Sequence, residues 1–145
     1  KIITDLERMG DEAAKIARMA QLIYADDRIH KPRFNEIRHV ANIAMEMLRK
    51  SLDAFARLDV VEAAQVARQD ELVDEEFRSI IRQLVTFMME DPRNISSSIE
   101  ILFAAKAIER IGDHAKNMSE YVIYLVKGKD VRHADIKEIE RVAQK

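Results

Sequence analysis

The same short acidic motif occurs twice in the sequence, once near the start and once in the last third of the chain. Each copy reads Glu-Arg-X-Gly-Asp, with Glu7 and Asp11 in the first copy and Glu109 and Asp113 in the second. Two carboxylates four residues apart on a helix lie about one turn apart, so they can share a cation that prefers oxygen ligands. The motif therefore offers binding of a hard metal ion, and its recurrence indicates a duplicated unit of about three helices.

A solvated charged surface is the alternative explanation for each acidic pair. Charged side chains are mostly exposed in folded proteins, and Arg8 and Arg110 offer positive charges that could neutralise acids nearby. A glycine nonetheless precedes the second acid in both copies, although glycine costs a helix about 1 kcal/mol relative to alanine. The close approach of a ligand or of another backbone would explain that cost, so the repeat and the glycines favour a functional site.

Asp70 and Asp74 form a third pair with the same spacing, within an acidic run that ends at Glu76. Asp70 flanks the apolar stripe of its predicted helix. Two interpretations stay open here: Asp70 approaches the acids of a neighbouring helix, or the run is simply a solvated face.

Apolar residues spaced by threes and fours predict an all-α protein with four helices. Short connections between helices favour antiparallel neighbours. We therefore predict an antiparallel three-helix bundle over residues 31–129, preceded by one additional helix over residues 1–25 that docks on the bundle or on a second chain. Residues 130–145 form a tail with one or two weak helical turns.

Residues that begin and end helices support these boundaries. Asp59 is placed to cap the third helix, with Glu62 in a capping-box position. Pro92 stops that helix, Asn94 or the serines at 96–98 can cap the next one, and Gly128 suits its C-terminal end.

The helical period also predicts the direction of the motif acids. Glu109 and Asp113 lie about 150° or more from the centre of their helix's apolar stripe, so they should face away from the core. The same reasoning turns Glu7 and Asp11 outward from the first helix.

Composition excludes several classes of function. A net charge of −2 argues against a nucleic-acid surface, and no segment is apolar for long enough to span a bilayer, so the chain is peripheral to a membrane at most. The chain has no cysteine, which fits the cytoplasm. Because it opens at Lys1 inside a helical pattern, we expect a fragment.

Two other functions compete with a metal-binding regulator. A ferritin-like di-metal enzyme needs paired Glu-x-x-His motifs, and only Glu36 and His39 have that spacing. His30, His114 and His133 are first interpreted as solvated and only second as auxiliary ligands. No nucleophile beside a base and no glycine-rich phosphate loop is visible, so we predict that the chain is not an enzyme. A helical bundle that binds partners without metal is the other alternative.

Several segments together resemble the PhoU family, and the resemblance covers nearly the whole chain. The segments are residues 7–13, 52–57, 82–91, 109–117 and 127–133. The resemblance implies tandem three-helix bundles, of which this chain would hold the last helix of the first and all of the second. It implies a negative regulator of phosphate uptake and phosphate-starvation signalling, linking a phosphate ABC transporter to a sensor histidine kinase. We also expect a homo-oligomer.

The resemblance also implies a multinuclear metal cluster on the bundle surface, of Fe, Mn, Mg or Zn. The positions that match the family's acidic pattern are Glu7 and Asp11, Asp70 and Asp74, and Glu109 and Asp113. Asn117 follows Asp113 by four residues, whereas Ala14 and Lys15 occupy the comparable stretch of the first copy. We therefore expect unequal metal affinity at the two sites, and the first site should lack its facing helix.

Overall fold

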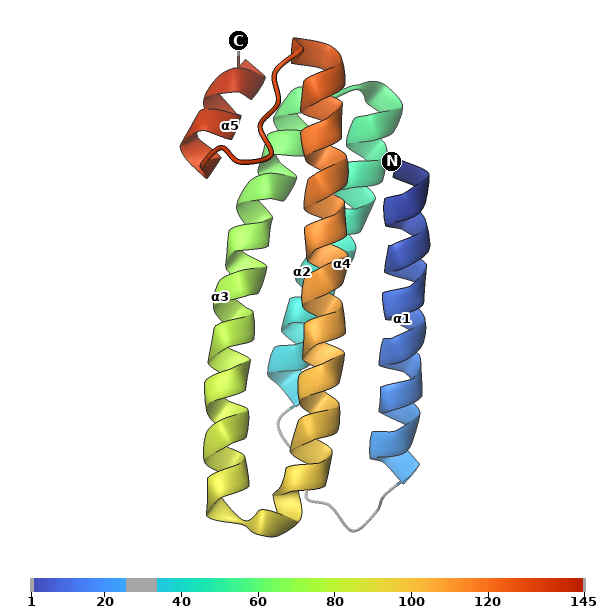
Figure 1. Ribbon diagram of the computed structural model, residues 1–145, viewed down its shortest axis with the longest axis vertical. Helices are drawn as coiled ribbons and strands as arrows, with labels where there is room; N and C mark the ends of the chain where they lie inside the picture. The colour runs from blue at the N-terminus through green and yellow to red at the C-terminus, as the bar shows by residue number, and fades with distance from the viewer. Residues whose placement is uncertain (1, 26–33, 145) are drawn as a thin grey trace.

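The computed structural model describes residues 2–25 and 34–144, and these ranges contain no β-strand, which confirms the all-α prediction. The helices are α1 (Ile2–Ala25), α2 (Phe34–Arg57), α3 (Val60–Glu90), α4 (Ile95–Lys127) and α5 (Ile136–Gln144), with the short 3-10 helix η1 (Pro92–Asn94) before α4. The four long helices lie side by side, each antiparallel to the one before it (Figure 1). No described helix is long and apolar enough to cross a membrane.

Helices α2, α3 and α4 contact one another and enclose the main core. Their apolar stripes meet along the bundle axis, which is how a helix with one apolar face buries it. The largest fully buried side chains of this core are Val40, Met47, Val66, Val73, Ile101 and Ile108. The predicted three-helix bundle is therefore present.

Helix α1 packs along α4 and, in the described part of the chain, on no other helix. The spacing by threes and fours predicts an apolar stripe for this helix that includes Leu6, Met9 and Ala13. Met9 is buried together with Asp5, whereas Leu6 and Ala13 are exposed. Of the two predicted docking partners, the bundle or a second chain, the structure shows the bundle, with a buried face of α1 that is rotated from the predicted one. The division into two successive repeats, 1–25 and 31–129, stays a prediction, and residues 26–33 lie outside the described ranges.

The turns between helices follow most of the predicted capping. The Asp59 carboxylate accepts hydrogen bonds from the backbone N–H groups of Val61 and Glu62, and Gly128 ends α4 with a left-handed φ of 71°. In a capping box the Glu62 side chain would accept a hydrogen bond from the Asp59 N–H. Here the Asp59 N–H donates to the Ala54 carbonyl instead. Asn94 makes no side-chain cap; its amide donates to the Phe87 carbonyl instead.

The predicted weak turns of the tail are a regular helix, α5, which packs mainly on α3. Ile139, Val142 and Ala143 are buried in a second apolar cluster with Ala54, Val122 and Val131. The Arg68 guanidinium donates to the Glu140 carboxylate across this contact. Burial of one apolar face stabilises a helix that is too short to be stable alone.

Candidate metal centre

Three of the six predicted ligands lie together where α3 and α4 pack side by side. Asp70 and Asp74 come from α3 and Asp113 from α4, and each offers a carboxylate oxygen within 4.8 Å of the other two. The i, i+4 spacing of the two α3 acids places both beside α4, because residues four apart share one face of a helix. We call Asp70, Asp74 and Asp113 the acidic cluster.

Asp70 is the deepest member of the acidic cluster. It is 4% exposed, and its Oδ1 has no hydrogen-bond partner. A buried oxygen without a partner loses its hydration and receives nothing in return, which is rare in native proteins. Gly112 of α4 lies beside this oxygen, since a β carbon at that position would meet Asp70 Oδ1 at 3.4 Å.

The electrostatics of the acidic cluster disfavour three charged carboxylates without a counter-ion. Burial, followed by the charges of Asp74 and Asp113, raises the pKa of Asp70 to about 7. Burial and the charge of Glu109 raise the pKa of Asp74, and burial, Asp74 and Glu109 raise that of Asp113. A cation among these groups would relieve both the burial cost and the repulsion.

Glu109 lies at the edge of the acidic cluster and forms an ion pair with Lys106. Its side chain is 13% exposed and accepts a hydrogen bond from Lys106 Nζ at 2.7 Å. The Lys106 ammonium also lies 5.3 Å from the centre of the Phe77 ring. Glu109 is thus a neighbour of the cluster whose carboxylate would have to turn from Lys106 to join it.

The acidic cluster fits a hard cation on three grounds. Its donors are all carboxylate oxygens, which suit Mg²⁺, Mn²⁺ and similar ions. The donors converge from two helices, and one of the donors is the buried Asp70 carboxylate, whose Oδ1 has no hydrogen-bond partner. A bound cation would supply positive charge and cross-link α3 to α4.

The motif acids of α4 face outward as predicted, but toward α3 and not into open solvent. Asp113 as a whole residue is exposed, although neighbouring atoms partly desolvate its carboxylate, and Glu109 is half-buried at the α3–α4 edge. Of the two interpretations of Asp70, the approach to a neighbouring helix is the one that the structure shows. Asp70 had been placed beside the apolar stripe, and it is buried.

Glu7 and Asp11 lie apart from the acidic cluster. Both are exposed on α1, and Asp11 lines a shallow surface depression with Arg8, Lys15, Arg18 and His114. α1 packs only on α4 within the described residues, so no helix there faces Glu7 and Asp11 with further acids. Their role as ligands stays a prediction.

Sequence reasoning missed the partner of His114. His114 Nδ1 lies 2.9 Å from Asp5 Oδ1 across the α1–α4 contact, and both side chains are largely buried. The sequence had suggested a solvated His114 first and an auxiliary metal ligand second. The structure shows instead that its Nδ1 is directed at Asp5, away from solvent and from the acidic cluster. The two residues are 109 positions apart, and the one available signal was that Asp5 shares a helical face with Met9.

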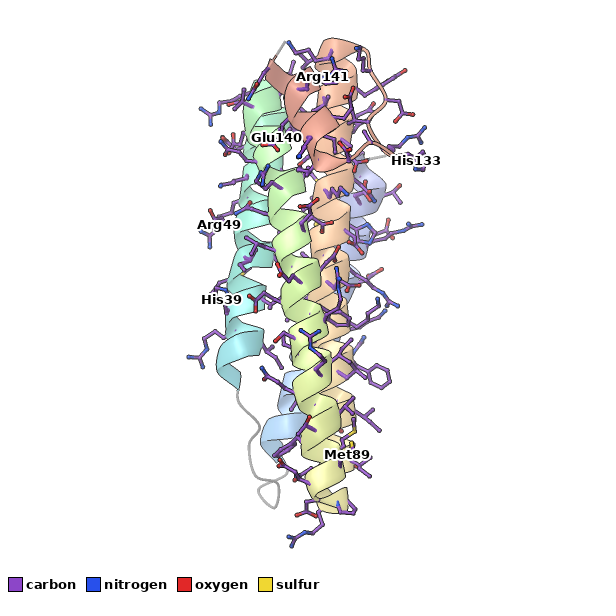
Figure 2. The ribbon with its side chains drawn as sticks, turned by 90° about the vertical axis from the view of Figure 1, so that its left-hand side faces the viewer. His39, Arg49, Met89, His133, Glu140 and Arg141 are labelled. Carbon is purple, nitrogen blue, oxygen red and sulfur yellow. The ribbon has the colours of Figure 1, made fainter. Side chains whose placement is uncertain are left out.

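The other two histidines in the described ranges, His39 and His133, are not gathered around the acids. His39 projects from α2 together with Arg49, and His133 is exposed beyond α4 (Figure 2). His30 and the side chain of Glu36, which has the Glu-x-x-His spacing to His39, lie outside the described residues.

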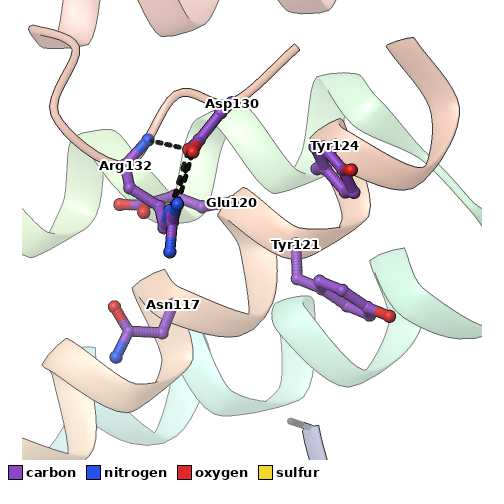
Figure 3. Close-up of a pocket in the computed structure, with 6 residues that line it drawn as sticks. All are labelled: Asn117, Glu120, Tyr121, Tyr124, Asp130 and Arg132. Atoms are coloured by element: carbon purple, nitrogen blue, oxygen red, sulfur yellow. Dashed lines mark hydrogen bonds and ion pairs between the residues drawn. The ribbon is translucent and has the colours of Figure 1, made fainter. Parts of the chain in front are cut away.

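A cavity of about 350 Å³ lies near the C-terminal end of α4 (Figure 3). Its walls include the Tyr121 and Tyr124 rings, which stack with centroids 6.5 Å apart, and Arg132, which pairs with Asp130. Asn117 and the buried Glu120 complete the lining. None of the residues predicted as ligands lines this cavity.

The chain matches the model of a known protein family. The model of the PhoU domain matches residues 37–122, which is more than half of the chain and includes the whole acidic cluster. The chain belongs to the PhoU family. The resemblance drawn from its sequence motifs is confirmed.

Named relatives of this PhoU-family chain agree. A "phosphate-specific transport system accessory protein PhoU homolog" from Pseudomonas putida is 49% identical over 96% of this chain and 54% of its own length. The Escherichia coli "phosphate-specific transport system accessory protein PhoU" is 43% identical over 98% of this chain and 58% of its own length. The crystal structure of PhoU from Pseudomonas aeruginosa matches with a TM-score of 0.85 and 46% identity, over 89% of this chain and 61% of that one. The chain thus spans little more than half the length of these relatives.

Proposed function

We propose that this chain is a metal-binding regulatory adaptor of phosphate uptake. In this proposal it restrains phosphate uptake and phosphate-starvation signalling by linking a phosphate ABC transporter to a sensor histidine kinase in the cytoplasm. The relatives support the first part, because they are named as accessory proteins of a phosphate-specific transport system. The same names describe accessory proteins and not enzymes, which supports an adaptor.

One observation carries the metal-binding part of the proposal. The Asp70 Oδ1 atom is buried, unpartnered and part of a group of three carboxylates from two helices. A cation bound by Asp70, Asp74 and Asp113 would give that oxygen a partner and neutralise the repulsion among the three acids. It would also hold α3 and α4 at fixed separation, which would preserve the surface that a partner recognises.

Titration calorimetry with Mn²⁺, repeated with Mg²⁺, Zn²⁺ and anaerobic Fe²⁺, tests the metal site. We expect binding that weakens by about tenfold or more in Asp70→Asn and Asp113→Asn, since each variant loses a charged ligand. Glu71→Gln is the matched control, because Glu71 is an exposed acid beside Asp70 on α3. Equal heats for wild type and both aspartate variants would remove the metal site.

A metal-free adaptor is the second candidate. It is favoured by Lys106 and Lys116, which place two ammonium groups beside the acids; Lys106 Nζ is 2.7 Å from Glu109 and Lys116 Nζ is 3.9 Å from Asp70. These two cations alone could balance part of the acidic charge. Co-purification tests the adaptor role, because the tagged chain should retain the transporter ATPase or the sensor kinase from a lysate. Retention that persists after a chelator removes divalent cations would favour the metal-free adaptor.

A further inference from the structure

Lys116 lies between two buried acids that belong to different parts of the molecule. Its Nζ atom is 3.9 Å from Asp70 Oδ2, in the acidic cluster, and 3.9 Å from Glu120 Oε1, one turn further along α4. Asp70 and Glu120 are 4% and 5% exposed, whereas about a third of the Lys116 side chain is exposed. One ammonium group is therefore shared between two carboxylates, at a distance longer than a good hydrogen bond to either.

A divalent cation bound by Asp70 would change this balance. The cation and the Lys116 ammonium would lie a few ångströms apart, where like charges repel strongly in a partly buried site. Lysine has a flexible four-carbon stem, so its ammonium can move without any change of the backbone. The second carboxylate, Glu120, is already within reach on the same helix.

Lys106, on the other side of the site, lacks this freedom. It donates to Glu109 at 2.7 Å and lies over the Phe77 ring, so it has two close partners outside the acidic cluster. Within the described ranges, Lys116 is thus the lysine that forms an ion pair with a member of the acidic cluster.

We propose that the Lys116 ammonium competes with the metal for Asp70, and that it shifts to Glu120 when the metal binds. This inference rests on the proposed metal site. Lys116 then sets the metal concentration at which the site fills. Glu120 lines the cavity together with Arg132 and Tyr124 (Figure 3). The shift would therefore bring positive charge closer to the cavity wall.

Mn²⁺ titration of four variants tests this competition. Lys116→Met should bind Mn²⁺ about tenfold more tightly than wild type, because the competing cation is gone. Glu120→Gln should bind it more weakly, because Lys116 then has Asp70 as its closest acid. The double variant Lys116→Met/Glu120→Gln should match Lys116→Met, since Glu120 acts through Lys116. Lys127→Met is the control, because it removes one positive charge from the far end of α4.

The outcomes separate this inference from the proposed site. If wild type binds Mn²⁺ and Lys116→Met binds no more tightly than Lys127→Met, the competition is disproved and the metal site stands. If Glu120→Gln weakens binding as much in the Lys116→Met background as in wild type, the shift to Glu120 is disproved. If neither wild type nor Lys116→Met binds Mn²⁺, both the site and the competition are wrong.

Discussion

Gly112 of α4 lies against Asp70 of α3, so that a β carbon on Gly112 would stand 3.4 Å from the unpartnered Asp70 Oδ1. The other atoms near that position belong to Met47, at 3.7 Å, which is an ordinary contact distance. The 3.4 Å contact with Asp70 Oδ1 is at the close limit of ordinary contact, so a methyl group fits here with at most a small shift of that carboxylate. Sterics alone do not require a glycine here, but the glycine leaves this side of the buried Asp70 oxygen without a methyl group against it.

Gly112→Ala should consequently stabilise the metal-free chain while weakening its metal binding. Alanine favours a helix over glycine by about 1 kcal/mol, and the new methyl group covers an oxygen that would otherwise bind a cation. Urea unfolding measures the first effect and Mn²⁺ titration the second. Gly10→Ala is the control from the other copy of the motif, where no neighbouring atom lies within 4 Å. It should raise stability alone, and unchanged Mn²⁺ affinity in Gly112→Ala would contradict the prediction.

Asp70 should make the metal-free chain more stable at pH 5 than at pH 8. Its pKa is raised from 3.8 to about 7, mainly by burial and then by the neighbouring charges of Asp74 and Asp113. The folded chain therefore holds this proton more tightly than the unfolded chain does, and the free energy of unfolding falls as the pH rises between those two values. The raised pKa values of Asp74 and Asp113 act in the same direction. Urea midpoints measured at intervals of half a pH unit will show this slope.

Asp70→Asn should make that pH profile less steep without removing its slope, because Asp74 and Asp113 still contribute. Saturating Mg²⁺ should flatten the wild-type profile by favouring the deprotonated carboxylates. The acids with lowered pKa values, Asp53, Asp130 and Glu140, do not interfere. Their stabilisation is present above their unfolded-state pKa and is lost only as the pH falls through the lower folded-state value, which is below pH 5. A wild-type profile without slope between pH 5 and pH 8 would show that Asp70 titrates normally.

The helices and most of their ends could be predicted because they depend on neighbouring residues. The apolar period, the Asp59 cap and the Gly128 stop are all local signals, and each one has its expected role in the structure. The acidic pairs were also visible as pairs. The burial of Asp70 could not be predicted in this way, because it depends on how α3 is rotated against α4. The apolar pattern of α3 alone placed Asp70 only at the margin of the stripe.

The interactions that depend on two distant segments were the ones that sequence reasoning missed. Asp5 and His114 meet across the α1–α4 contact, and Lys116 meets Asp70 across the α3–α4 contact. Neither contact produces a periodic pattern in the sequence, because each involves only one polar residue from each helix. The predicted buried face of α1 was right at Met9 and wrong at Leu6 for the same reason, since the structure buries Asp5 in place of Leu6.

Ile139→Ala should undock α5 from the bundle. Ile139 is 1% exposed and packs in the apolar cluster with Val131 and Val142. Truncation of a buried isoleucine costs about 2–5 kcal/mol, through lost burial and the cavity that remains. Urea unfolding with circular dichroism measures the loss, and Lys137→Ala, an exposed change in the same helix, is the control. A loss no larger than that of the control would show that α5 adds little to the stability of the bundle.

Asp5→Ala should loosen α1 while leaving the three-helix bundle intact. The Asp5 carboxylate is the partner of His114 at 2.9 Å, and α1 packs on α4 alone within the described residues. Removing one partner of a largely buried polar pair costs about 1–3 kcal/mol, because the other group loses its hydrogen bond without regaining full hydration. We expect faster hydrogen exchange in α1 and unchanged exchange in the core of α2, α3 and α4. Glu7→Ala, an exposed change on the same helix, should leave α1 protected, and equal exchange in the two variants would show that this pair does not hold α1 in place.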